Sequence, residues 1–437
     1  MPLVPVIVAA LFFCAHLSAS PPDHSRQLVG HGGPVNSIAV NHDGSRALSG
    51  SLDYSVILWD LTGPSPRPLH RFLEHRGAVS EVRFVPGGDQ AVSAGDDGTI
   101  YLWETRQLRL LHRFTGHQAK VVSIGFTPDG STMASASWDG SLRVWDLPSR
   151  QAVTTIEVHR QTLHAVLLSG DGKRAYSAGH DGHIREWNIA TGQMLRVLHN
   201  HGWPINLMRW LPDGQHIVFG TANGDVQVLD LASGHIDKVL IPHSKPVLGL
   251  SVSDDGSLIA TGGNDGTIRV WRMEDWSLSG ETHGIPGPVW ALAFTDDNRG
   301  LWFGSLDDAA GYWPISADDD TDWAPEQKPR RFQVTSGMPA GELQFARKCS
   351  VCHDIDPGPT NRAGPSLYKV MGRRAGTLPG YAYSNALRQS SLVWDRDNIE
   401  RLFVQGPHIV VPGSKMPLQK IPNATNRAAL IDFLAAQ

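Results

Sequence analysis

Short apolar segments alternate with tight polar turns along most of the chain. Between positions 117 and 146, the segment VVSIGF is followed by the turn PDG, the segment MASAS, the turn WDG and the segment SLRVWD. Apolar and polar residues alternate within these segments, and glycine- and aspartate-containing turns typically join neighbouring antiparallel strands. The pattern predicts short β-strands joined by tight turns.

The same unit recurs seven times. Each unit has a histidine, an aspartate or asparagine turn some twenty residues later, and a closing residue that is tryptophan in six units. The histidines are His31, His75, His117, His159, His201, His243 and His283, at steps of 40 to 44 residues. The turn residues are Asp53, Asp97, Asp139, Asp181, Asn223, Asp265 and Asp307, and the closing residues are Trp59, Trp103, Trp145, Trp187, Leu229, Trp271 and Trp313. A period of this length is typical of repeat architectures.

The turns PDG, DDG, WDG and NDG and the endings WD, WE and WN resemble those of the WD-repeat family across residues 25–315. The resemblance implies an all-β propeller of seven blades around a central channel. The segment SRQLVGH at 25–31 has the pattern of an outer strand, and no similar segment follows Trp313. We therefore expect this amino-terminal strand to complete the seventh blade and remove two open sheet edges.

The regular histidines raise the question of a metal site, because imidazole is the commonest metal ligand. In WD repeats, by resemblance, such a histidine instead bonds the turn aspartate, and a serine or threonine and the tryptophan complete a buried network. His117, Ser135, Asp139 and Trp145 fit this pattern, so we expect a structural role. The fifth unit has Asn223 and a closing leucine, and we expect its network to be broken.

The positions five residues after the repeat histidines are expected to face the channel. They are Asn36, Ser80, Val122, His164, Asn206 and Leu248. A copper cluster such as that of the seven-bladed nitrous oxide reductases would need a converging ring of histidines. His164 alone meets this requirement, so we expect no copper cluster.

Composition sets limits on the class of protein. The length of 437 residues allows two or three domains, and 41% hydrophobic with 19% charged residues exclude a disordered or fibrous chain. A net charge of −5 argues against a nucleic-acid binder. Positions 337–437 carry twelve Lys and Arg against seven Asp and Glu, a balance of +5, and the remainder of the chain therefore carries −10.

The amino terminus predicts export. Residues 1–20 contain a nearly continuous apolar run from Leu3 to Ala15 and then the small residues Ser18, Ala19 and Ser20, as in a secretory signal peptide. The expected location is the periplasm. The alternative is an uncleaved membrane anchor, although the run is shorter than the ~20 residues of a spanning helix.

Residues 316–337 are rich in charge and proline, and they predict a linker to a second domain at 338–437. There, Ala340 to Lys348 has the pattern of a helix and leads into CSVCH at 349–353, the c-type haem attachment pattern. Two cysteine thiols at this spacing add to the two vinyl groups of a haem, and the adjoining histidine imidazole reaches the haem iron. If the two cysteines formed a redox dithiol, we would expect a βαβ pattern around them. If they bound zinc, we would expect a second pair of ligands in the sequence. Neither is present, and with three cysteines in the chain a disulfide scaffold is excluded.

The landmarks KCSVCH, AGPSLYKVMGRRAGTLPGYAYSNAL, SLVW, VPGSKMPL and NRAALIDFLAA resemble class I cytochromes c of the mitochondrial and purple-bacterial type. The resemblance implies an all-α domain with one covalently bound haem c. It assigns Cys349 and Cys352 to the thioether bonds, His353 and Met416 to the iron, Pro365 to orienting the histidine, and Arg373, Tyr383 and Trp394 to the propionates.

The resemblance also implies a contact between Phe345 and Phe433 of the first and last helices. Met338, Met371 and His408 are rival distal ligands, but none lies in the VPGSKMP loop. Met371 is expected in the core, and His408 at the surface. At Leu402 or Phe403, relatives often have a tyrosine that bonds the methionine sulfur.

With both axial positions of the iron filled by the protein, the predicted function is transfer of single electrons between redox partner proteins, not enzyme catalysis. The methionine ligand is expected to give a fairly high reduction potential. The propeller is expected to dock proteins on its flat faces. Two alternatives remain open: an enzyme whose propeller houses a second cofactor fed by the haem, and a haem-based redox sensor or scaffold. Membrane association is also left open.

Overall fold

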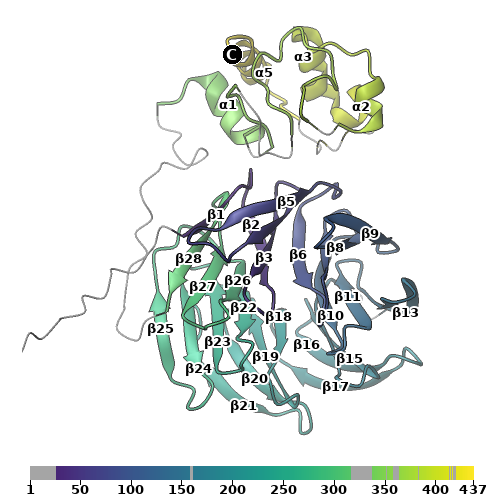
Figure 1. The fold of residues 1–437 in the computed structure, drawn as a ribbon, viewed down its shortest axis with the longest axis vertical. Coiled ribbons are helices and arrows are strands. Elements are labelled where there is room, and N and C mark those ends of the chain that lie inside the picture. Colours follow the sequence, from purple (N-terminus) through teal and green to yellow (C-terminus); the bar gives the residue numbers. More distant parts are fainter. Residues whose placement is uncertain are drawn as a thin grey trace, which may run out of the picture.

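A computed structural model shows an all-β part followed by a helical part (Figure 1). It describes residues 26–157, 161–315, 337–350, 352–357, 364–381, 383–412, 414, 416 and 420–437. Residues 1–20, the expected signal peptide, and all but the last residue of the expected linker lie outside this description. Among the described helices, none is long and apolar enough to cross a membrane.

Seven four-stranded antiparallel sheets form the all-β part, as the repeat predicts. Blades 1 to 6 each contain four consecutive strands, and blade 7 has the order β1-β28-β27-β26. Blades 1 to 3 comprise β2 (Val35–Val40), β3 (Arg46–Ser51), β4 (Val56–Asp60), β5 (Arg67–Phe72), β6 (Val79–Phe84), β7 (Gln90–Gly95), β8 (Ile100–Glu104), β9 (Arg109–Phe114), β10 (Val121–Phe126), β11 (Thr132–Ser137), β12 (Ser141–Asp146) and β13 (Gln151–Glu157).

Blades 4 to 7 have the same construction. They comprise β14 (Leu163–Leu168), β15 (Arg174–Gly179), β16 (His183–Asn188), β17 (Met194–Asn200), β18 (Ile205–Trp210), β19 (His216–Thr221), β20 (Val226–Asp230), β21 (Ile236–Leu240), β22 (Val247–Val252), β23 (Leu258–Gly263), β24 (Ile268–Arg272), β25 (Leu278–Thr282), β26 (Ala291–Phe294), β27 (Gly300–Gly304), β28 (Ala309–Pro314) and β1 (Gln27–Val29). Buried aliphatic and aromatic side chains of neighbouring blades pack against each other.

The amino-terminal strand closes the ring. β1 pairs antiparallel with β28, so that Leu28 lies opposite Ala310, and both are fully buried. Next to this strand, the Arg26 guanidinium lies over the rings of Trp302 and Tyr312, at 5.6 and 5.1 Å from their centroids. The expected completion of the seventh blade is confirmed, and the first and last repeats are held together through this sheet.

The repeat histidines are structural in the blades with intact networks. His117 Nδ1 lies 3.0 Å from Asp139 Oδ2, and its Nε2 lies 2.8 Å from Ser135 Oγ, which also accepts from Trp145 Nε1 at 3.0 Å. The same contacts join His31, Asp53, Ser49 and Trp59 in blade 1 and His75, Asp97, Ser93 and Trp103 in blade 2. In blade 6, His243 contacts Asp265 and Thr261. These bonds satisfy polar groups in a dry environment.

Blade 4 is described in part. Its Trp187 Nε1 donates to Ser177 Oγ at 2.8 Å, as in the intact networks. The histidine expected to complete this set, His159, lies outside the described residues. The tryptophan and serine half of the predicted network is therefore present.

The fifth network is broken, as expected. His201 Nε2 lies 3.2 Å from Asp225 Oδ2, so the ring contacts a residue two positions after the turn asparagine. Leu229 closes the unit with no hydrogen-bond donor and is fully buried. Because Leu229 packs with Ile217 and Phe219, this blade replaces polar bonds with apolar packing.

The seventh unit differs from its prediction. Ile285, not His283, occupies the histidine position, because its amide donates to Gly266 as the amide of His243 donates to Gly224. The choice of His283 as the seventh repeat histidine was wrong by two residues. Trp313 closes the unit as predicted and is buried, but its Nε1 has no hydrogen-bond partner among the described residues.

We expect Ser135→Ala to lower the free energy of unfolding by about 1–3 kcal/mol, because it leaves two buried ring nitrogens, on His117 and Trp145, without a partner. Denaturant titration followed by tryptophan fluorescence measures the effect. Ser305→Ala in blade 7 is the control, since Ser305 donates to the Pro286 carbonyl and not to a ring nitrogen. Equal losses in the two variants would contradict a network role for Ser135.

The helical part contains short helices around one apolar cluster. They are α1 (Ala340–Lys348), α2 (Asn385–Gln389), α3 (Arg396–Gln405), α4 (Pro407–Val410) and α5 (Ala424–Ala435). α1 has the bounds that its sequence predicts. The side chains of Asp395 and Asn423 cap α3 and α5 by accepting from backbone amides, which satisfies donors that a helix start leaves open.

The first and last helices cross closely at Gly341. A Cβ atom at this position would lie 2.2 Å from the carbonyl oxygen of Ala429 and 2.6 Å from the Cβ of Phe433. The expected contact of Phe345 with Phe433 is present, with ring centroids 5.6 Å apart. Glycine is therefore the residue that allows this crossing.

Gly341→Ala is expected to destabilise the helical part by about 1–3 kcal/mol, because the added methyl forces α1 and α5 apart. The sign is the opposite of that for an exposed helix, where replacing glycine by alanine stabilises by roughly 0.5–1 kcal/mol. Hydrogen exchange of the α5 amides, read by mass spectrometry, measures the change. Gly170→Ala, whose Cβ would meet no atom nearer than 3.9 Å, serves as the control for the substitution itself. Unchanged protection of α5 would show that the crossing tolerates a methyl group.

Candidate functional site

One pocket in the helical part contains all the side chains that the sequence assigned to a haem. Those lining it are Cys349, Cys352, His353, Pro365, Arg373, Tyr383, Trp394 and Met416. They come from the end of α1, the segment after it, the residues flanking α2 and α3, and the segment before α5. The fold thus gathers residues that lie up to 67 positions apart in the chain.

The two cysteines follow directly from α1. The amide of Cys349 donates to Phe345 at 2.8 Å, and the amide of His353 donates to Cys349 at 2.8 Å, so the backbone continues by one turn. Neither cysteine forms a disulfide bond, and burial raises the pKa of Cys349 to about 12. A redox-active dithiol needs a lowered thiol pKa, so this environment disfavours that alternative.

The histidine is held by a backbone carbonyl. His353 Nδ1 donates to the carbonyl oxygen of Pro365 at 2.8 Å, which leaves the lone pair of the imidazole on Nε2. Gly364 makes this approach possible, because a Cβ there would lie 2.4 Å from His353 Cε1. The arrangement fits a histidine whose Nε2 ligates a metal.

Met416 lines the same pocket, and its amide donates to Ser414 Oγ at 3.0 Å. Leu402 and Phe403 also line the pocket, so the position where relatives often carry a tyrosine is apolar. Met416 therefore contacts surroundings made largely of hydrocarbon.

The rival ligands lie elsewhere. Met371 is partly buried against the apolar core, and His408 is exposed, as expected. Met338 is partly buried at the start of the helical part, and none of the three lines the pocket.

Polar side chains, among them Arg373 and Tyr383, also line the pocket. Arg373 donates to the carbonyls of Ser366 at 2.5 Å and Tyr368 at 3.2 Å, and its own carbonyl accepts from the amide of Trp394 at 2.9 Å. Burial lowers the pKa of Arg373, and the neighbouring Tyr383 opposes this effect. Because its guanidinium remains at the pocket, Arg373 can offer positive charge to an anionic group.

Sequence reasoning missed Tyr381, which also lines the pocket. Its ring packs edge-on against Tyr383 with centroids 4.7 Å apart, and burial raises its pKa to about 12. The spacing of two residues in YAY is the pattern that could have indicated a second tyrosine on this side.

Four residues of the propeller complete the lining. They are Asp53, Tyr54, Leu73 and His75, from blade 1 and the start of blade 2. Asp53 and His75 belong to the structural networks described above, whereas Tyr54 and Leu73 do not. Burial raises the pKa of Tyr54, and the Cys352 sulfur is close enough to add to the rise. No pattern within a single repeat could have indicated this contribution.

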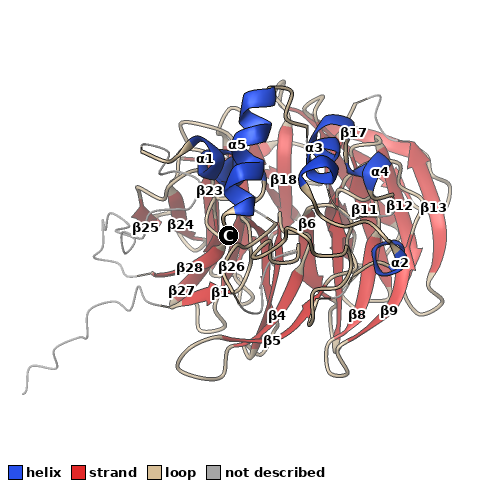
Figure 2. Cartoon of the chain, turned by 90° about the horizontal axis from the view of Figure 1, so that it is seen from above, coloured by secondary structure: helices blue, strands red, loops and turns tan. Residues whose placement is uncertain are grey.

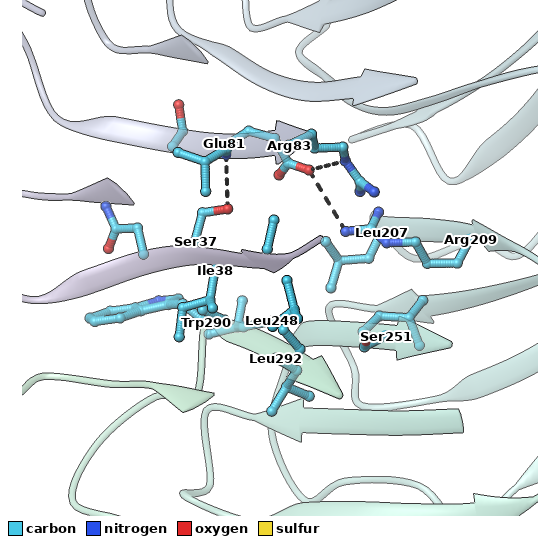
Figure 3. Close-up of a pocket in the computed structure, with 18 of the residues that line it drawn as sticks. Ser37, Ile38, Glu81, Arg83, Leu207, Arg209, Leu248, Ser251, Trp290 and Leu292 are labelled. Carbon is cyan, nitrogen blue, oxygen red and sulfur yellow. Dashed lines mark hydrogen bonds and ion pairs between the residues drawn. The ribbon is translucent and has the colours of Figure 1, made fainter. Parts of the chain in front are cut away.

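The central channel is a second pocket, and its lining contains the six residues that the repeat predicted there. Figure 3 shows part of this lining. His164, the single histidine of its lining, contacts Thr162 at 3.0 Å and the Ile205 carbonyl at 3.2 Å. The ring of histidines needed for a copper cluster is therefore missing from the described lining.

Charged side chains meet in the channel across two blades. Glu81 accepts from Arg83 Nε at 2.8 Å and lies 3.9 Å from Arg209 Nη2 (Figure 3). Burial lowers the pKa of Arg209 to about 9. The Glu81 carboxylate thus lies between two guanidinium groups and partly neutralises the positive charges of Arg83 and Arg209.

The propeller matches a known repeat family. The family described as "WD domain, G-beta repeat" matches residues 23–60, 66–104, 108–146, 150–188 and 234–272. These ranges leave out the fifth and seventh units, whose described hydrogen bonds differ from those of blades 1 to 3.

The helical part is similar to small cytochromes. Cytochrome c2 of Rhodomicrobium vannielii is 36% identical over 102 residues, which are 23% of this chain and 81% of the relative. Cytochrome c2 of Rhodoblastus acidophilus is 40% identical over 96 residues, 22% of this chain and 88% of the relative. Cytochrome c of Euglena viridis is 37% identical over 94 residues, 22% of this chain and 90% of the relative.

Proposed function

With its carboxyl-terminal domain the chain belongs to the cytochrome c family, and from this premise we propose that the protein is a periplasmic c-type cytochrome with one haem. It passes single electrons between redox partner proteins, and its WD40 propeller is the platform on which proteins dock. Family membership implies haem c and electron transfer. We propose in addition that the chain carries one covalently attached haem, that it is periplasmic and that proteins dock on its propeller.

The observation that carries the proposal is the meeting of His353 and Met416 in one pocket with both cysteines. Cys349 and Cys352 would bind the haem covalently, and the hydrogen bond from His353 to the Pro365 carbonyl leaves Nε2 as the atom that would ligate the iron. With His353 and Met416 as its protein ligands, the haem iron would supply one-electron transfer without binding a substrate.

The remaining lining of the pocket supports a class I cytochrome c domain. Arg373, Tyr383 and Trp394 line the pocket and would hold the haem propionates. The apolar residues of the lining would keep water from the iron, which together with a methionine ligand would favour the ferrous form and a fairly high potential. Such a carrier suits delivery of electrons to a terminal oxidase or reductase.

Export agrees with this chemistry. Residues 1–20 act as the signal peptide, and the haem is attached after transport. If the apolar run is retained, it anchors the chain at the membrane. In either case the haem domain and the propeller operate outside the cytoplasm.

The test is to produce the chain in a bacterium competent for export and cytochrome c maturation. A pyridine haemochrome assay is expected to give one haem per chain, and a coulometric titration to give one electron per chain. Elemental analysis is expected to find iron alone. A colourless mature protein would overturn the proposal. A second metal or chromophore would instead favour the alternative of an enzyme whose propeller houses a second cofactor.

A further inference from the structure

The turn between β3 and β4 in blade 1 differs from its counterparts in the other blades. At the position of Tyr54, with φ +69°, five other blades have glycine, also at positive φ. These are Gly98, Gly140, Gly182, Gly224 and Gly266. An L-residue in this conformation costs about 1–2 kcal/mol, which a glycine avoids. A strained tyrosine at a glycine position indicates a role for its side chain beyond the turn.

The base of this turn is rigid. Asp53 is fully buried and accepts from the amide of Gly32 at 2.7 Å and from the hydroxyl of Ser55 at 2.6 Å, in addition to contacting His31. The amide of Tyr54 donates to the Ser51 carbonyl at 3.2 Å. Tyr54 therefore projects from a preorganised support and not from a loose loop.

The side chain of Tyr54 reaches the helical domain. With Leu73 of the strand-to-strand connection that follows β5, it lines the pocket that contains Cys352 and His353. The helical domain lies beside the end of the propeller where β1, β2 and β5 are labelled, and the view from above places its helices in front of the strands (Figures 1 and 2). The tyrosine thus joins two parts that lie about 300 positions apart in the chain.

The charges of the two parts favour their association. Positions 337–437 carry +5 and the rest of the chain −10. Opposite charges on tethered domains attract one another, and salt weakens the attraction over a distance of about 10 Å at 0.1 M ionic strength. Since the domains share one chain, the effective concentration of one near the other is high.

We propose that the blade-1 turn bearing Tyr54 is the docking site of the chain's own cytochrome domain, on which the tyrosine and Leu73 cover the haem pocket on the side of Cys352. This inference rests on the proposed haem. The chain's own cytochrome domain therefore binds this region of the propeller. A redox partner reaches the covered side of the haem only when the two domains separate.

Tyr54→Gly tests the proposal in the full-length holoprotein, because it installs the residue of five sister blades and relieves the positive φ. Two quantities are measured, at low and high salt: the radius of gyration by small-angle scattering, and the rate at which dithionite reduces the ferric haem. Trp138→Ala is the matched control, since this tryptophan lies in the corresponding turn of blade 3, is 49% exposed and does not line the pocket.

We expect Tyr54→Gly to increase the ratio of separated to docked molecules about tenfold, which is 1.4 kcal/mol. Its particles are larger and its haem is reduced faster than in the unmodified protein, and high salt shifts the unmodified protein in the same direction. Trp138→Ala behaves as the unmodified protein.

Identical scattering and reduction rates in the two variants would overturn the docking site, as would an unmodified protein that is already extended at low salt. The visible spectrum separates this failure from that of the proposed function. If the haem spectrum is unchanged but the domains do not dock, the proposed electron transfer still holds. If no haem is present, both the docking proposal and the electron-transfer proposal fail.

Discussion

Met416→Ala is expected to abolish the weak red absorption band of methionine-ligated ferric haem and to lower the reduction potential. The physical reason is that a thioether favours ferrous iron, and alanine offers no ligand. The expected fall is on the order of 0.1–0.3 V, part of the roughly 0.8 V over which axial ligands set haem potentials. Spectroelectrochemical titration of the purified holoprotein measures both effects together.

Met371→Ala is the matched control for the methionine ligand. Met371 is partly buried against the same apolar core but does not line the pocket. We expect this variant to lose some stability and to keep the band and the potential. If the band persists in Met416→Ala and disappears in Met371→Ala, the distal ligand has been misassigned.

The second large effect is expected from the double variant Cys349→Ser with Cys352→Ser. Without either thiol no thioether forms, so haem staining after a denaturing gel is expected to be lost completely. Leu402 and Phe403 line the pocket proposed for the haem, so loss of the haem is also expected to expose the helical domain to hydrogen exchange.

The propeller is expected to stay folded in the same double variant. Its apolar clusters contain residues of the blades, whereas the core of the helical domain is a separate cluster. Protected amides in β3, β7 and β11 are the readout for this part of the result. Cys14→Ser, which changes the remaining cysteine within the expected signal peptide, is the control and should stain normally. Stable haem staining of the double variant would refute covalent attachment through this pair.

Much of the site could be predicted because its chemistry depends on short spacings. CSVCH places two thiols and an imidazole within five residues, and a helix that begins at Ala340 puts them at its end. The Pro365 carbonyl and Met416 could be assigned through the resemblance of their surrounding sequence to known cytochromes. The structure brings these residues into one pocket.

Most positions of the repeat could also be predicted from the sequence, and one of them was assigned wrongly. His283 is near the right step and has the right residue type, but Ile285 holds the backbone position of the histidine. Sequence spacing tolerates a shift of two residues, whereas the hydrogen-bond register between blades does not. The seventh unit could be aligned only once the amide of Ile285 was seen to bond Gly266.

The sequence by itself determined the seven blades, their closure by the amino-terminal strand and the residues suited to hold a haem. These features depend on period, on alternation and on motifs that are local in the chain. Tertiary structure alone decided that Ile285 replaces a histidine and that Tyr54 lines a pocket beside Cys352. Contacts between distant segments produce no period and no motif in the sequence. They depend on how whole domains pack and on which side chains then face each other.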